Sequence, residues 1–221
     1  MTTVEHPPTG QPFRLSGISW KTYVAMRDVP ENQHVRMTFD RGELEMMSPS
    51  KRHEKLAILI DRIIHAWAEE RDIDIESCRT MTCRREDLGR GLEPDNCYYV
   101  RHAAAMRARE ELDLSIDRPP ELAIEIDITR IALDKLDLYA AIGVPEVWRC
   151  SGQSLQVYRL DSAGHYAQHP GSGIFPAFPT AEAERVLRQA GEVSEIVLVK
   201  SFRQWVRDNS RPGAQGDGGN V

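Results

Sequence analysis

The stretch covering residues 121–139, ELAIEIDITRIALDKLDLY, limits what this chain can fold into more than any other. It opens as an apolar run, and side chains along a β-strand point alternately to opposite faces. One face would carry only leucine and isoleucine, whereas the other would carry Glu125 and Asp127. Burying two neighbouring carboxylates on a core strand is costly unless a cation or a proton donor meets them. The pattern therefore predicts a buried strand with a functional site on one face.

A short helix is predicted directly after this strand, over about residues 131–142, with Thr129 as its N-cap. Lys135 interrupts an otherwise apolar face of that helix, and lysine is rarely buried without a partner. Because the connection is only two or three residues long, Lys135 is expected to reach back toward Glu125 and Asp127. A lysine that extends its charged end to water at the sheet edge is the alternative.

Two earlier segments supply further acidic side chains. Alternating apolar and polar residues over 35–40, a turn at Asp40-Arg41-Gly42 and a returning strand over 43–47 predict a hairpin that carries Glu45. A strand is expected to begin at about Asp95, because Pro94 is tolerated at the start of a strand.

The clearest helix is predicted over residues 51–71, where apolar side chains recur every three or four positions. His53 lies in its first turn, directly after the strand that carries Glu45. Two interpretations of His53 stay open: a surface or capping histidine, and a further residue of the site.

Glu45, Asp95, Glu125 and Lys135 together fit the hydrolysis of a phosphodiester. Hard divalent cations such as Mg²⁺ take oxygen ligands and usually only one or two protein carboxylates, which leaves positions for water and phosphate. A metal ion bound by Asp95 and Glu125 would polarise a phosphate and lower the pKa of a bound water. A lysine beside it would stabilise the added negative charge of the transition state. Any one of these acids, taken alone, is more often an ordinary ion-paired residue.

The order of these motifs resembles the PD-(D/E)xK nuclease superfamily and, more specifically, the Uma-two family of restriction-endonuclease-like proteins. The segments that carry the resemblance, over roughly residues 19–206, are GELEMMSPS with His53-Glu54, LEPDNCYY, ELAIEIDIT and LDKLDLYAAIGVPEVWR. The resemblance implies an α/β fold in which a mixed central β-sheet is flanked by α-helices. It also implies nuclease chemistry with Mg²⁺ or Mn²⁺ as the cofactor.

Carried onto this sequence, the resemblance makes Asp95 and Glu125 the metal-binding acids and Glu45 the acid that precedes the first core helix. Lys135 corresponds to a lysine that has moved from the strand to the following helix. The sequence departs from the superfamily pattern at Asp127, which stands where the usual lysine would be. Asp127 is then either a third metal ligand or the salt-bridge partner of Lys135.

The expected function is that of a Mg²⁺- or Mn²⁺-dependent endodeoxyribonuclease, a hydrolase, with Glu45, Asp95, Glu125 and Lys135 as its catalytic residues. A catalytically inactive nucleic-acid- or partner-binding module on the same fold is the alternative. DNA is the expected partner, although the sequence does not distinguish DNA from RNA. A homodimer is also expected, because cutting two strands with one site per chain would usually need two copies.

Length and composition narrow the remaining classes of protein. The 221 residues suffice for one substantial domain, predicted over 17–208, with a flexible lead-in at 1–16 and a disordered tail at 209–221. Neither an apolar run near the roughly 18 residues of a membrane span nor a secretory signal is visible, so a cytoplasmic protein without membrane contact is expected. The four cysteines lack zinc-ligand spacing. A formal net charge of −6 argues mildly against a surface coated by non-specific nucleic-acid contacts.

Overall fold

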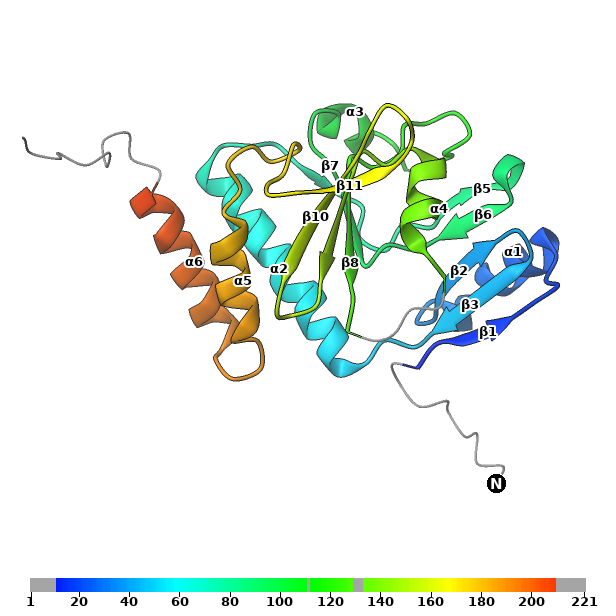
Figure 1. Cartoon of the computed structure of the whole chain (residues 1–221), viewed down its shortest axis with the longest axis horizontal. Helices are drawn as coiled ribbons and strands as arrows, with labels where there is room; N and C mark the ends of the chain where they lie inside the picture. The colour runs from blue at the N-terminus through cyan, green and yellow to red at the C-terminus, as the bar shows by residue number, and fades with distance from the viewer. Residues whose placement is uncertain (1–10, 111, 129–132, 210–221) are drawn as a thin grey trace, which may run out of the picture.

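The structure is a computed structural model that describes residues 11–110, 112–128 and 133–209. Two β-sheets lie beside each other, and helices pack around them (Figure 1). The smaller sheet has five strands in the order β1 (Phe13–Leu15), β3 (Glu43–Met47), β2 (Arg36–Asp40), β6 (Arg90–Leu92) and β5 (Cys83–Arg85). The larger sheet has six, in the order β11 (Tyr166–His169), β10 (Leu155–Leu160), β9 (Glu146–Cys150), β8 (Leu122–Ile126), β7 (Asn96–Tyr99) and β4 (Glu76–Ser77).

The larger sheet is mixed, because β8 and β9 are parallel whereas its other neighbouring strands are antiparallel. Parallel neighbours need a crossover connection, and here the crossover contains a helix. The helices are α1 (Trp20–Arg27), α2 (Lys51–Glu70), α3 (Ala103–Arg107), α4 (Lys135–Ile142), α5 (Thr180–Arg188) and α6 (Glu195–Asn209). Helices α2, α5 and α6 cover one face of the sheet and α4 covers the other, so the expected α/β fold with a mixed, helix-flanked sheet is confirmed (Figure 1).

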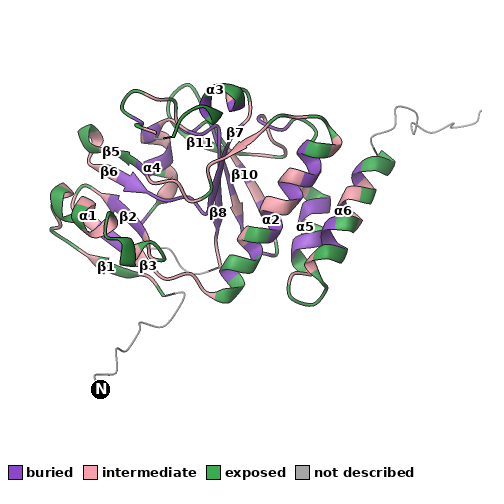
Figure 2. Ribbon diagram, turned by 180° about the vertical axis from the view of Figure 1, so that it is seen from behind, coloured by how far each residue is buried: buried purple, intermediate pink, exposed green. Residues whose placement is uncertain are grey.

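The core lies on both faces of β8, all of whose residues are buried (Figure 2). Leu122, Ile124 and Ile126 belong to the larger apolar cluster, which they share with α2, α5 and α6. Ala123 belongs to a second cluster beneath α4. The predicted alternation of this strand is therefore confirmed, and Glu125 lies on the α4 side with Ala123.

The predicted hairpin is present as β2 and β3, joined at Arg41 and Gly42. Both turn residues have positive φ, 46° and 99°, as the tightest hairpin turns require. Tyr23 of α1 stacks on Phe39 of β2, with ring centroids 4.9 Å apart, and closes the outer face of the smaller sheet.

Two predicted boundaries are wrong. Phe13–Leu15, assigned to the flexible lead-in, form β1 because they pair antiparallel with β3. Helix α4 begins at Lys135 rather than near residue 131, since the side chain of Asp134 caps it by accepting a hydrogen bond from the Leu136 amide at 3.0 Å. Thr129, the predicted cap, and residues 1–10 and 210–221 lie outside the described residues, and the single-domain division stays a prediction. None of the helices in the described ranges is long and apolar enough to cross a membrane.

Candidate active site

Asp95 lies directly before β7, beside the end of β8 that carries Glu125. Asn96 of β7 lies opposite Ile124 of β8, and the Asp95 amide donates to the Ile124 carbonyl at 3.0 Å. The two carboxylates are close enough for the charge of Asp95 to raise the pKa of Glu125. Both residues are buried, with 8% and 3% of their surface exposed. Two carboxylates from distant parts of the chain thus share one buried position on the sheet.

Helix α4 holds both carboxylate oxygens of Glu125. Lys135 Nζ donates to Oε2 at 2.5 Å, and the hydroxyl of Tyr139, one turn further along α4, donates to Oε1. The contact expected between Lys135 and Glu125 is therefore present. Burial raises the pKa of Glu125, the charge of Lys135 opposes that shift, and the charge of Asp95 adds to it. Burial alone would lower the pKa of Lys135, but Glu125 and Asp95 outweigh it and raise that pKa, so the ammonium stays charged.

Asp95 is held by a backbone amide and faces a histidine and an arginine. The Ile126 amide donates to Oδ2 at 2.7 Å. His53 Nε2 lies 3.2 Å from the same oxygen, although the two atoms are not aligned as a hydrogen bond. Arg36 Nε lies 3.7 Å from Oδ1. Burial alone would raise the pKa of Asp95, but His53 and Lys135 outweigh it and lower that pKa, so the carboxylate is the stable form.

His53 is buried rather than at the surface, with 2% of its area exposed. Burial alone would lower the pKa of the imidazole, but the carboxylate of Asp95 outweighs burial and raises it. Of the two interpretations of His53, the structure contradicts the surface residue and brings the imidazole to Asp95.

Glu45 joins the smaller sheet to the segment before α4. It is buried on β3, and its Oε2 accepts a hydrogen bond from the Leu133 amide at 3.3 Å. Its negative charge also contributes to the raised pKa of Lys135. Glu45 therefore lies beside the Glu125–Lys135 pair, on the other sheet.

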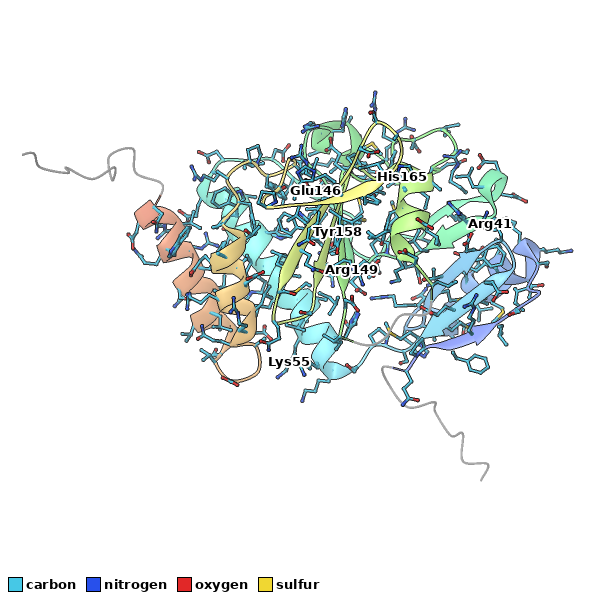
Figure 3. All side chains as sticks on the ribbon, in the orientation of Figure 1. Arg41, Lys55, Glu146, Arg149, Tyr158 and His165 are labelled. Carbon is cyan, nitrogen blue, oxygen red and sulfur yellow. The ribbon has the colours of Figure 1, made fainter. Side chains whose placement is uncertain are left out.

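The carboxylate of Asp127 pairs with Arg149 of β9, whereas Lys135 pairs with Glu125. Arg149, labelled in Figure 3, lies opposite Glu125 in the parallel register, so the two side chains share one face of the sheet. The role of Asp127 as salt-bridge partner of Lys135 is therefore wrong. Its role as a third metal ligand stays untested.

Sequence patterns did not identify two arginines of this region as residues near the site. Arg36 precedes Thr38 by two residues on β2, and Thr38 lies opposite Glu45, so all three share the face that meets the larger sheet. The hairpin pattern could have identified Arg36 by this alternation. Arg149 could not have been found in this way, because its position depends on the register between β8 and β9.

The donor chemistry of Asp95 and Glu125 fits a hard divalent cation. Two carboxylates on one face supply the oxygen ligands that Mg²⁺ and Mn²⁺ prefer. Among the described residues, no group of three or more His, Cys, Asp or Glu could hold a metal ion. Mg²⁺ usually takes only one or two protein carboxylates and keeps several waters.

Comparison with known proteins identifies a family for this chain and a similar solved structure. The model of the Uma2 family, described as "Putative restriction endonuclease", matches residues 20–191. No curated protein matches the chain. A similar solved structure is that of "a putative nuclease belonging to DUF820" from Anabaena variabilis ATCC 29413, with 16% sequence identity and a TM-score of 0.49. The similarity covers 84% of this chain and 99% of that one.

Proposed function

Because the chain belongs to the Uma2 family, we propose that it is a metal-dependent endonuclease that hydrolyses phosphodiester bonds of DNA. One observation carries the proposal: two buried carboxylates, Asp95 and Glu125, lie near each other at the end of β8, with a charged lysine 2.5 Å from the second. Such clusters of buried ionisable groups favour functional sites. A homodimer with one site for each DNA strand belongs to the same proposal, and a sizing measurement that finds only monomer with and without DNA would contradict it.

Asp95 and Glu125 are the residues that would hold Mg²⁺ or Mn²⁺, which when bound polarises the phosphate and lowers the pKa of a bound water. Lys135 keeps its proton beside Glu125 and stabilises negative charge that develops on the phosphate. Tyr139 fixes the orientation of the Glu125 carboxylate through its hydroxyl. Glu45 positions Lys135 indirectly, since it holds the Leu133 amide just before α4.

Addition of Mn²⁺ at about one hundred times its Kd should raise the melting temperature of the native protein by about 5–10 °C. Binding at that excess stabilises a fold by about 2.7 kcal/mol, and each kcal/mol shifts Tm by about 2–4 °C in a chain of this size. Asp95→Asn should abolish the shift, because the amide removes one of the two anionic ligands. Differential scanning fluorimetry with and without Mn²⁺ measures both values.

Glu93→Gln is the matched control for this experiment. Glu93 is buried like Asp95 and only two residues away, but its carboxylate accepts hydrogen bonds from the Met37 amide and Thr82 and pairs with Arg27. Mn²⁺ should raise the melting temperature of Glu93→Gln as much as that of the native protein, even if the variant melts at a lower temperature without metal. Equal shifts in the native protein and in Asp95→Asn would refute the metal site.

Arg36→Met is expected to lower kcat for DNA cleavage by about a hundredfold, the usual cost of one preorganised electrostatic contact. The guanidinium faces Asp95, and its Nε is buried without a hydrogen-bond partner among the described residues. Arg36→Lys should recover part of the loss, because it restores the charge without the planar fork. Steady-state cleavage of a labelled duplex in Mn²⁺ gives the three rates.

Arg90→Met provides the comparison for Arg36. Arg90 lies on β6 in the same sheet and is as buried as Arg36, but it pairs with Asp40 at 3.0 Å. Its replacement should leave kcat within about threefold, since its other contact is with the main-chain carbonyl of Asp137 on α4 and not with a side chain of the site. Similar losses in the two methionine variants would mean that Arg36 acts only through the stability of the sheet.

One observation favours the alternative of a catalytically inactive binding module. Both site carboxylates already have basic side chains beside them, Lys135 for Glu125 and His53 with Arg36 for Asp95. That module would bind duplex or a partner without metal-dependent cleavage. It would be discarded if Glu125→Gln abolished a cleavage activity measured for the native protein.

A further inference from the structure

Three exposed cations stand together at the start of α2: Lys51, Arg52 and Lys55. In the part of the chain that the structure describes, no carboxylate forms an ion pair with any of them. Two nearby arginines do form ion pairs: Arg62 pairs with Glu195 at 3.3 Å and Arg188 pairs with Glu184 at 3.2 Å. A protein of formal net charge −6 thus keeps a local group of positive charges that it does not neutralise.

These cations line a groove of about 620 Å³. Its other walls come from the turn between β9 and β10, from the end of α5 and from residues 190–192. Gly152 brings the turn against α2: it has a φ of +79°, and a Cβ on it would lie 3.0 Å from Leu56 Cδ1. The close packing of the β9–β10 turn against α2 therefore fixes this wall of the groove. Glu192 is the acidic residue that lines the groove.

The groove opens at the same edge of the sheet as the carboxylate pair. Strands β8 and β9 are parallel, so the end of β8 near Glu125 and the turn after β9 lie at one edge. The first turn of α2 reaches that edge as well, where Lys55 is exposed (Figure 3). Within this turn His53 points inward to Asp95, at 3.2 Å, whereas Arg52 and Lys55 are exposed. One helical turn thus contributes to the candidate active site with one side and to the groove with the other.

We propose that this groove binds the sugar–phosphate backbone of double-stranded DNA to one side of the carboxylate site. The inference rests on the proposed function for the identity of the polyanion. Lysine and arginine contacts to phosphates supply most of the non-specific affinity of DNA-binding proteins and fix their register on the duplex. Free cations beside a phosphodiester-hydrolysing site match that role, whereas the paired arginines elsewhere are already neutralised.

The test is the binding of a fluorescein-labelled DNA duplex by anisotropy, in EDTA so that no cleavage occurs, at several salt concentrations. The variant Lys51→Gln/Arg52→Gln/Lys55→Gln is expected to bind about tenfold or more weakly near 0.1 M salt. Its slope of log K against log salt should fall in magnitude by about 2–3, because each lost phosphate contact removes about 0.9. The charge-matched control is Lys21→Gln/Arg79→Gln/Lys200→Gln, which removes three exposed cations at scattered positions that form no ion pair with a described residue. It should keep the native slope.

Equal losses in the two triple variants would overturn the groove, since only net charge would then matter. Tight binding to duplex RNA with none to duplex DNA would overturn it as well. Cleavage is scored separately in Mn²⁺. A native protein that cuts no DNA but shows groove-dependent binding in EDTA would refute the proposed function and support the groove. If the native protein cleaves DNA but the groove variant binds DNA with the native salt dependence, the proposed function would be supported and the groove refuted.

Discussion

Replacing Lys135 with methionine is expected to lower the free energy of unfolding by about 3–5 kcal/mol, which is the cost of removing one partner from a buried ion pair. The side chain of Lys135 is 12% exposed and that of Glu125 is 4% exposed, so water cannot replace the lost ammonium. The hydroxyl of Tyr139 would remain as a donor, but a neutral donor does not compensate a buried charge that also faces Asp95. Urea denaturation in EDTA, followed by circular dichroism, measures the loss.

Two further variants make this result interpretable. Lys55→Met has the same chemical change at an exposed, unpaired position and should alter stability by no more than about 0.5 kcal/mol. Lys135→Met/Glu125→Gln should be more stable than Lys135→Met alone, since the double change leaves no unpaired charge. A cost below about 1 kcal/mol for Lys135→Met would instead place the pair in the class of solvated surface ion pairs.

Asp95→Asn should reduce DNA cleavage by about a thousandfold, at the upper end of the loss seen when one preorganised electrostatic group is removed. The substitution keeps the size of the side chain and its ability to accept the Ile126 amide, but it removes the negative charge that would bind the cation. Single-turnover cleavage of a labelled duplex with saturating Mn²⁺ gives the rate of the chemical step.

The binding of DNA separates this loss from misfolding. Asp95→Asn should bind the duplex in EDTA at least as tightly as the native protein, because it carries one negative charge fewer. Glu93→Gln should cleave at close to the native rate, since Glu93 faces Arg27 and not the carboxylate pair. Native-like cleavage by Asp95→Asn would remove Asp95 from the site and leave the proposed mechanism without its first metal ligand.

The elements that sequence patterns predicted are those whose signal is local. The hairpin of β2 and β3, the helix α2 and the alternation of β8 each depend on residues within one segment, and the structure contains all three. The edge strand β1 was missed because three residues carry too little pattern, and only pairing with β3 makes them a strand. The start of α4 was misplaced because two polar residues, Thr129 and Asp134, could each have capped it.

The candidate site divides in the same way. The contact between Lys135 and Glu125 was predicted from a connection of two or three residues, and the contact is present although residues 127–134 separate β8 from α4. The contact forms because α4 packs on the face of the sheet that carries Glu125. The ion pair between Asp127 and Arg149 could not be predicted from the sequence, because the parallel pairing of β8 and β9 brings these two residues together. Arg36 belongs to the other sheet, so its approach to Asp95 depends on how the two sheets meet.

Two of the donors that hold the site carboxylates are main-chain amides, those of Ile126 for Asp95 and of Leu133 for Glu45. Every amino acid except proline provides the same N–H. Natural variants of this chain are therefore free to exchange the side chains at these two positions for others of suitable size without losing the hydrogen bonds. Proline at either position would remove a donor while leaving all the acids in place, so a chain can keep every acidic motif and still lose the support of its site.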